Sequence, residues 1–126
     1  DAYYFRGRAN YELSEYNLAL DDFMASVRNN PVDAEFHYWK GKTEWKLKRI
    51  RSAIESLEEA LIYNPGHFDV YRTLGTIYTE MEMFSKAREN YDKAMNVNSN
   101  FVSGFFNKSK VKENLTDIKL ALLEFD

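Results

Sequence analysis

The sequence predicts an all-α protein built from repeated pairs of antiparallel helices. Three observations lead to this prediction. Residue types recur every 34 positions, apolar residues inside each period have helical spacing, and helix-breaking residues separate one period from the next. The only two prolines, Pro31 and Pro65, lie one such period apart.

Three columns of equivalent residues stay in phase along the chain. Very small residues form the first column, alanines the second, and large apolar residues the third, four positions after the alanines. The columns are Gly7, Gly41, Gly75 and Ser109; Ala19, Ala53, Ala87 and Ala121; and Phe23, Leu57, Tyr91 and Phe125. Columns that keep their phase without a gap indicate a true repeat.

The period divides the chain into successive units of two helices. We expect a single domain over residues 1–126, with units at 1–31, 32–65 and 66–99 and a partial fourth unit at 100–126. The unit at 66–99 shows the pattern well, because apolar residues on each side of a short hinge at 80–83 recur at helical spacing. Asn, Pro, Ser and Gly residues end each unit, as helix-stop signals do.

Gly75 lies in the middle of a predicted amphipathic helix, where glycine costs about 1 kcal/mol relative to alanine. We expect Gly75 to face Ala87, because two very small side chains allow two helix backbones to approach closely. The same interpretation predicts that Gly7 faces Ala19 and that Gly41 faces Ala53. The glycines are therefore interpreted as packing residues and not as a phosphate-binding loop.

These residues resemble the tetratricopeptide repeat family. The third unit carries the family pattern nearly complete, with Ser99 in place of its final proline; the matching residues are Tyr71, Leu74, Gly75, Tyr78, Ala87, Tyr91 and Ala94. The resemblance implies a right-handed superhelical solenoid whose first helices line a concave groove. It also implies a scaffold or adaptor that binds peptide segments of partner proteins. We expect no enzymatic activity, because the sequence shows no nucleophile, metal-ligand set or phosphate loop.

Composition narrows the classes of function. A net charge of -3 lacks the basic excess of a nucleic-acid-binding domain. The absence of cysteine excludes disulfides and thiolate metal sites, and no run of apolar residues reaches the length of a membrane span. We therefore expect no cofactor, no metal, no nucleic acid and no membrane contact, and a cytoplasmic location.

The groove face predicted from the family geometry is aromatic and basic. The expected hydrophobic anchors are Tyr4, Phe5, Tyr11, Tyr38, Trp39 and Trp45, and the expected cations are Arg8, Lys42, Arg72 and Lys110. Together they favour a partner segment with acidic and hydrophobic character. Two alternatives stay open: neighbouring repeats could cover several of the rings, and the cations could be a solvated row. A second function, homo-oligomer formation through the aromatic face or the partial fourth repeat, also stays open.

Other candidate sites are better explained by structure. His37 and His67 lack ligand-spaced partners, and the basic stretch 46–51 is interpreted as a solvated turn. The paired carboxylates Asp21-Asp22 and Glu58-Glu59 are interpreted as a solvated outer face. The residues that would hold a chaperone-tail carboxylate in relatives do not match here in either register, so we expect no such clamp.

Overall fold

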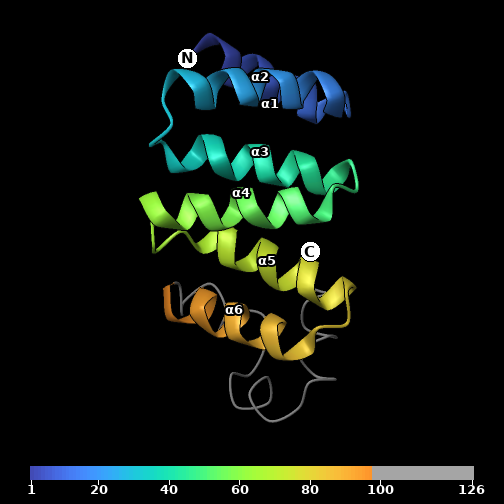
Figure 1. Ribbon diagram of the computed structural model, residues 1–126, viewed down its shortest axis with the longest axis vertical. Coiled ribbons are helices and arrows are strands. Elements are labelled where there is room, and N and C mark those ends of the chain that lie inside the picture. Colours follow the sequence, from blue (N-terminus) through green and yellow to red (C-terminus); the bar gives the residue numbers. More distant parts are fainter. Residues whose placement is uncertain (98–126) are drawn as a thin grey trace. The chain divides into compact units, whose positions relative to one another are not determined.

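The computed structural model describes residues 1–97, which form six helices and no strand (Figure 1). The helices are α1 (Ala2–Glu12), α2 (Tyr16–Asn29), α3 (Ala34–Lys46), α4 (Ile50–Tyr63), α5 (Phe68–Glu80) and α6 (Phe84–Val97). The predicted all-α fold of helix pairs is confirmed for these residues. The predicted fourth unit at 100–126 lies outside them.

The described residues divide into two compact units, with the boundary between Pro65 and Gly66. In the first unit α1 packs on α2, α2 on α3, and α3 on α4. In the second unit α5 packs on α6. The division falls between residues 65 and 66, where the sequence predicts one repeat to end and the next to begin.

The same tight turn joins the two helices of each of the three pairs within residues 1–97. Its middle residue has a left-handed backbone, with φ of 61° at Ser14, 65° at Lys48 and 58° at Glu82. The next amide donates back over five residues to a helix carbonyl, from Glu15 to Asn10, from Arg49 to Glu44 and from Met83 to Tyr78, at 2.8 to 2.9 Å. This bond and the left-handed residue define the Schellman motif, here without the glycine that usually occupies it.

The alanine and large apolar columns form the core, as predicted. Ala19, Ala53 and Ala87 are fully buried, and so are Phe23 and Leu57. The first helix of each pair begins at a capping side chain, Asp1 for α1, Asp33 for α3 and His67 for α5. Each cap accepts a hydrogen bond from a backbone amide of the first turn, and this satisfies one otherwise unpaired donor.

The space around the glycine of the first column differs from repeat to repeat. A methyl group added at Gly75 would lie 3.6 Å from the carbonyl oxygen of Ala87, an ordinary contact. Gly75 therefore faces Ala87 as expected, but the fit would accept a side chain. At Gly41 the added carbon would lie 3.1 Å from the Ala53 carbonyl oxygen and 2.9 Å from the Leu57 side chain.

At Gly7 the residues that would block an added side chain differ from the expected one. The nearest atoms to an added carbon belong to Phe23, at 2.8 Å, and to Asp22, at 3.1 Å, rather than to Ala19. The need for glycine is therefore set by the large residue of the third column in the first two repeats. In the third repeat this need is relaxed.

Candidate functional site

Six of the predicted groove residues lie together in the first unit. We call them the cation–aromatic cluster; they are Tyr4, Arg8 and Tyr11 of α1 and Tyr38, Trp39 and Lys42 of α3. Residues four and seven positions apart share one face of a helix, so the three α1 residues project on the same side. The sequence predicts this juxtaposition.

Trp39 is the centre of the cluster. The Arg8 guanidinium carbon lies 4.8 Å from the centroid of the indole ring, and the Lys42 ammonium nitrogen lies 4.9 Å from it. The Tyr11 ring meets the indole edge-on, with centroids 5.3 Å apart and planes at 83°. These distances are those of cation–π and edge-to-face contacts, which hold the two cations in place.

The expectation that Tyr38 and Trp39 stand open as hydrophobic anchors is wrong. Tyr38 is 4% exposed and Trp39 is 9% exposed. Trp39 packs against Phe23 of α2 and against the Tyr38 ring. Rings of the preceding repeat, Tyr11 of α1 and Phe23 of α2, thus cover Trp39, which is the packing alternative that the sequence leaves open.

The accessible aromatic surface comes from the other predicted anchors. Phe5 is 64% exposed and meets the Tyr4 ring edge-on, with centroids 5.4 Å apart. Tyr4 and Tyr11 are each partly exposed. Trp45 is also partly exposed and lies beneath the ammonium group of Lys46, 5.5 Å from the ring centroid.

Arg8 is exposed and has ring contacts only, to Tyr4 and Trp39. Within residues 1–97 no carboxylate forms an ion pair with it. Its charge is therefore held in one position without being neutralised by an anion. Such a group binds a carboxylate at a smaller loss of side-chain freedom than a mobile arginine does.

The remaining two predicted cations are not part of this cluster. Arg72 belongs to the second unit, where its Nε lies 3.7 Å from an oxygen of Asp69 on the same helix. Lys110 lies outside the described residues. The expectation that all four cations belong to one groove therefore stays a prediction.

Two polar clusters that the sequence interpretation missed lie between the helices of the first unit. Asp22 is 3% exposed, and both of its oxygens accept hydrogen bonds from Arg6 while one also accepts from Asn10. The assignment of Asp22 to a solvated face is therefore wrong. The hydrogen bonds and charge of Asp22 also raise the pKa of the Arg6 guanidinium above its ordinary value.

The second polar cluster lies one period later. Glu44 is 6% exposed and accepts a hydrogen bond of 2.6 Å from Ser56, while Lys40 contacts both residues. Positions 6, 10 and 22 of the first repeat correspond to 40, 44 and 56 of the second. The repeat spacing itself was therefore the signal that could have found both clusters.

The two histidines have structural contacts. His37 Nε2 lies 2.7 Å from the Pro31 carbonyl oxygen, and His67 caps α5 through Nδ1. Within residues 1–97 no three His, Cys, Asp or Glu side chains converge as metal ligands. The same residues include no helix with the length and apolar character needed to cross a bilayer.

Comparisons with known proteins agree with this geometry. Residues 4–61 and residues 68–101 each match a family model described as a tetratricopeptide repeat. The chain is 33% identical over 76 residues to human "Tetratricopeptide repeat protein 13", a match that covers 60% of this chain and 9% of that protein. It is 26% identical over 97 residues to the Arabidopsis thaliana "Protein CTR9 homolog", covering 74% of this chain and again 9% of the relative.

Solved structures share the fold at low sequence identity. The crystal structure of MamA has a TM-score of 0.78 at 21% identity, covering 97% of this chain and 75% of MamA. The first TPR of Spaghetti (RPAP3), bound to the HSP90 peptide SRMEEVD, has the same TM-score at 16% identity, covering 97% of this chain and 91% of that one.

A chain folded into repeated helical hairpins, whose first helices carry the cation–aromatic cluster, belongs to the class of helical-repeat proteins. The chain belongs to the tetratricopeptide repeat family. The expected fold class, all-α with the helix pairs of a tetratricopeptide-type solenoid, is confirmed, and the handedness of its superhelix stays a prediction. Domains of this family are protein–protein interaction modules.

Proposed function

We propose that this chain binds a peptide segment of a partner protein on the face formed by α1 and α3, as part of a scaffold or adaptor. The observation that carries the proposal is the position of Arg8. Its guanidinium group is exposed, has no carboxylate partner among residues 1–97, and is fixed against the Trp39 ring. A fixed and exposed cation beside accessible rings favours an acidic segment that also carries apolar side chains.

The hydrophobic part of the proposed contact comes from Phe5 and the Tyr4 ring beside it, together with the partly exposed Tyr11. Tyr38 and Trp39 act in this proposal as buried supports that position Arg8 and Lys42. Trp45, Arg72 and Lys110 are proposed as additional groups that contact the partner.

We also propose that binding does not use a terminal-carboxylate clamp. The positions that would form it are Tyr4, Arg8, Trp39, Asp69 and Thr73, and they lack the asparagine and lysine groups of that clamp. The peptide SRMEEVD and a scrambled version of it have the same charge, so we expect this chain to bind them with equal affinity.

The test is a selection of peptides from a random display library on the 126-residue chain, followed by titration of a synthetic selected peptide. We expect enrichment of acidic residues next to apolar ones. Arg8→Ala and Lys42→Ala should each weaken binding at least fivefold. Lys86→Ala is the matched control, because Lys86 also lies over a tyrosine ring, at 5.5 Å from Tyr78, but in the second unit. Selected peptides without acidic enrichment, or unchanged affinity for Arg8→Ala, would contradict the proposal.

A second candidate function is self-association through the aromatic end of α1. The supporting observation is the exposure of two rings there, Tyr3 at 44% and Phe5 at 64%. Light scattering over a concentration series would then show a rising mass, which Phe5→Ser should abolish. A constant monomer mass would eliminate this candidate and leave the peptide-binding proposal intact.

A further inference from the structure

The hairpin turn between α3 and α4 carries a dense positive charge. Four of the six residues from 46 to 51 are cations and all four are exposed; we call them the basic turn, and they are Lys46, Lys48, Arg49 and Arg51. The net charge of the whole chain is -3, so this positive charge is confined to the turn. Its exposure agrees with the solvated turn that the sequence predicts.

The other two hairpin turns show that the fold does not require cations at these positions. The middle residue has the same left-handed backbone in all three turns. The equivalent stretches 12–17 and 80–85 nevertheless contain no cation and two carboxylates each, which are Glu12 and Glu15 in the first and Glu80 and Glu82 in the third. One geometry is thus built twice with acidic residues and once with basic ones.

Helix electrostatics explain only part of this difference. Lys46 lies in the last turn of α3, where a cation is favourable. Arg49, by contrast, is the N-cap residue of α4 and makes no capping hydrogen bond with its side chain, and Arg51 lies in the first turn of that helix. A cation there faces the positive end of the helix dipole. Local rules of stability are most often broken at functional sites, so these two arginines favour a binding role.

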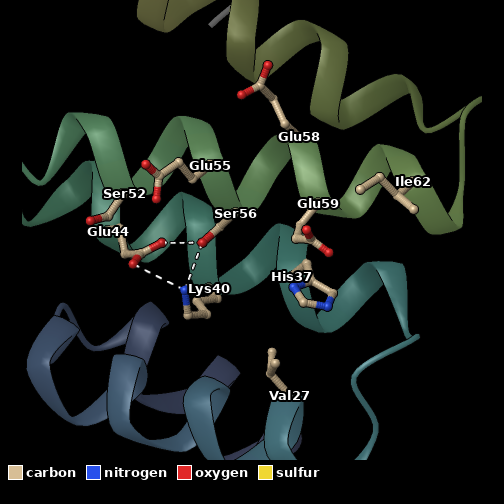
Figure 2. Close-up of a pocket in the computed structure, with 10 residues that line it drawn as sticks. All are labelled: Val27, His37, Lys40, Glu44, Ser52, Glu55, Ser56, Glu58, Glu59 and Ile62. Atoms are coloured by element: carbon tan, nitrogen blue, oxygen red, sulfur yellow. Dashed lines mark hydrogen bonds and ion pairs between the residues drawn. The ribbon is translucent and has the colours of Figure 1, made fainter.

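Nearby carboxylates leave the charge of the basic turn largely uncompensated. Figure 2 shows Glu44 turned toward Lys40 and Ser56, with which it forms hydrogen bonds. Glu55 lies 3.9 Å from Arg51, but both side chains are largely exposed, so this pair contributes little. The other three cations of the basic turn form no ion pair within residues 1–97. Their charge is therefore available to an anionic partner.

The basic turn continues the face that carries the cation–aromatic cluster. Trp39, Lys42 and Lys46 follow one another at three and four positions, so they share one side of α3. Lys46 lies about 6 Å beyond Lys42 along the helix axis. Its ammonium nitrogen lies 5.5 Å from the centroid of the Trp45 ring, so the pairing of cations with rings extends to the turn. The exposed Phe5 lies near the start of α1, at the opposite end of this face.

We infer that the basic turn binds a run of acidic residues in the partner segment that lies on the α1–α3 face. This inference rests on the proposed function, because it places the rest of the same segment on that face. Phe5 corresponds to position 39 of the second repeat, and Lys46 lies seven residues, or about 10 Å, further along. An extended segment covers this distance in about three residues. The partner segment therefore has an apolar side chain and, about three residues away, an acidic run.

A narrow acidic segment fits the first unit better than a flat anionic surface does. The turns 13–15 and 47–49 lie at the same end of this unit (Figure 1). A membrane that reached the basic turn would also meet the exposed carboxylates of Glu12 and Glu15, which repel it. Nucleic acid is disfavoured by the acidic net charge of the chain. A single peptide strand can contact the basic turn alone.

The direct test is an NMR titration of the 126-residue chain with the peptide acetyl-Leu-Phe-Gly-(Asp)6-amide and with the same sequence reversed. The control peptides have asparagine in place of aspartate, which keeps the shape and removes the charge. We expect saturable shifts of the amides 46–51, together with those of Phe5 and Arg8, for at least one aspartate peptide and for neither asparagine peptide in the basic turn.

The pattern of shifts separates this inference from the proposed function. Shifts at Phe5 and Arg8 without shifts in the basic turn would overturn the inference and leave the proposed function in place. Shifts confined to the basic turn would overturn the joint surface. Equal shifts of the basic turn with aspartate and asparagine, or shifts that do not saturate, would also overturn the inference.

Variants separate a specific surface from general attraction to a cation. Lys48→Ser/Arg49→Glu copies the residues at 14–15, which occupy the same turn in the first repeat, so the variant keeps a backbone that this chain already forms. It should weaken binding of the better aspartate peptide at least fivefold. Lys86→Ser/Lys93→Glu makes the same change in net charge at exposed positions of α6, and we expect less than a twofold effect. Equal weakening by both double variants would overturn the inference.

Other polyanions test the choice of partner. We expect phosphatidylserine vesicles and the single-stranded RNA U12 to bind at least fivefold more weakly than the better aspartate peptide, as measured by competition against that peptide carrying a fluorescent label. Displacement by either one at a concentration equal to that of unlabelled peptide would overturn the assignment to an acidic protein segment.

Discussion

Asp22 and Glu44 are buried carboxylates in equivalent polar clusters, but they lie on opposite helices of their pairs. Asp22 is on α2 and accepts hydrogen bonds from α1, whereas Glu44 is on α3 and accepts one from Ser56 of α4. Successive repeats thus place one carboxylate and one basic residue at the same interhelical contact, with the carboxylate exchanged between helices.

This exchange predicts that the second cluster can be transplanted into the first. Asn10→Glu alone puts a second carboxylate beside buried Asp22, and Asp22→Ser alone leaves Arg6 without its partner, so each should be destabilising. The double variant reproduces the side chains at 44 and 56, and we expect it to recover about 0.5–3 kcal/mol relative to the sum of the single changes. Urea unfolding of all four proteins measures this coupling, and simple additivity would contradict the prediction.

Gly75→Ala should be neutral or stabilising, by up to about 1 kcal/mol, because a methyl group fits there and alanine favours the helix. Gly41→Ala is the matched control. It should be destabilising, because the new carbon would lie 2.9 Å from Leu57 and 3.1 Å from a backbone oxygen. Thermal unfolding midpoints measure both effects. Equal losses for the two variants would show that the third repeat is packed as tightly as the second.

Lys48→Gly should stabilise the chain by roughly 1 kcal/mol, because Lys48 has a left-handed backbone that glycine adopts without steric strain. Lys46→Gly makes the same change two positions earlier, inside the last turn of α3. There glycine should cost about 1 kcal/mol, since the backbone is helical. Opposite signs in chemical denaturation would support the turn assignment, and two losses would refute it.

Trp39→Ala should destabilise the first unit by about 3–5 kcal/mol, because it removes a buried ring against which other rings and two cations pack. Trp45→Ala, at a partly exposed position, should have a much smaller effect. Far-UV circular dichroism during thermal unfolding distinguishes the two. A small loss for Trp39→Ala would mean that the ring is not structural and could return as a candidate anchor.

Much of the fold follows from the sequence, since the repeat period fixes which residues pair across each hairpin. The same periodicity places Arg8 and Lys42 on one side of their helices. How deeply a side chain is buried is harder to predict. The burial of Trp39, for example, depends on how closely α1 approaches α3. The sequence shows that both helices are aromatic, but not which ring covers which.

Asp22 and Gly75 illustrate the same difficulty. A carboxylate next to another carboxylate indicates a solvated face unless its partners on the adjacent helix, Arg6 and Asn10, are considered together with it. At Gly75 the small-residue column is intact, yet the space that glycine provides is not fully used. Each outcome depends on distances between helices, which residue spacing does not contain.

The recurring Schellman turn has a consequence for how this chain acquires its structure. Only three residues separate the helices of each pair, as at 13–15, 47–49 and 81–83, so partners that meet in a hairpin are near neighbours along the polypeptide. Little loop-closure entropy is lost in bringing them together. Nucleation can then begin at any hairpin and spread to the next, and helical chains dominated by such local contacts fold in about microseconds to milliseconds.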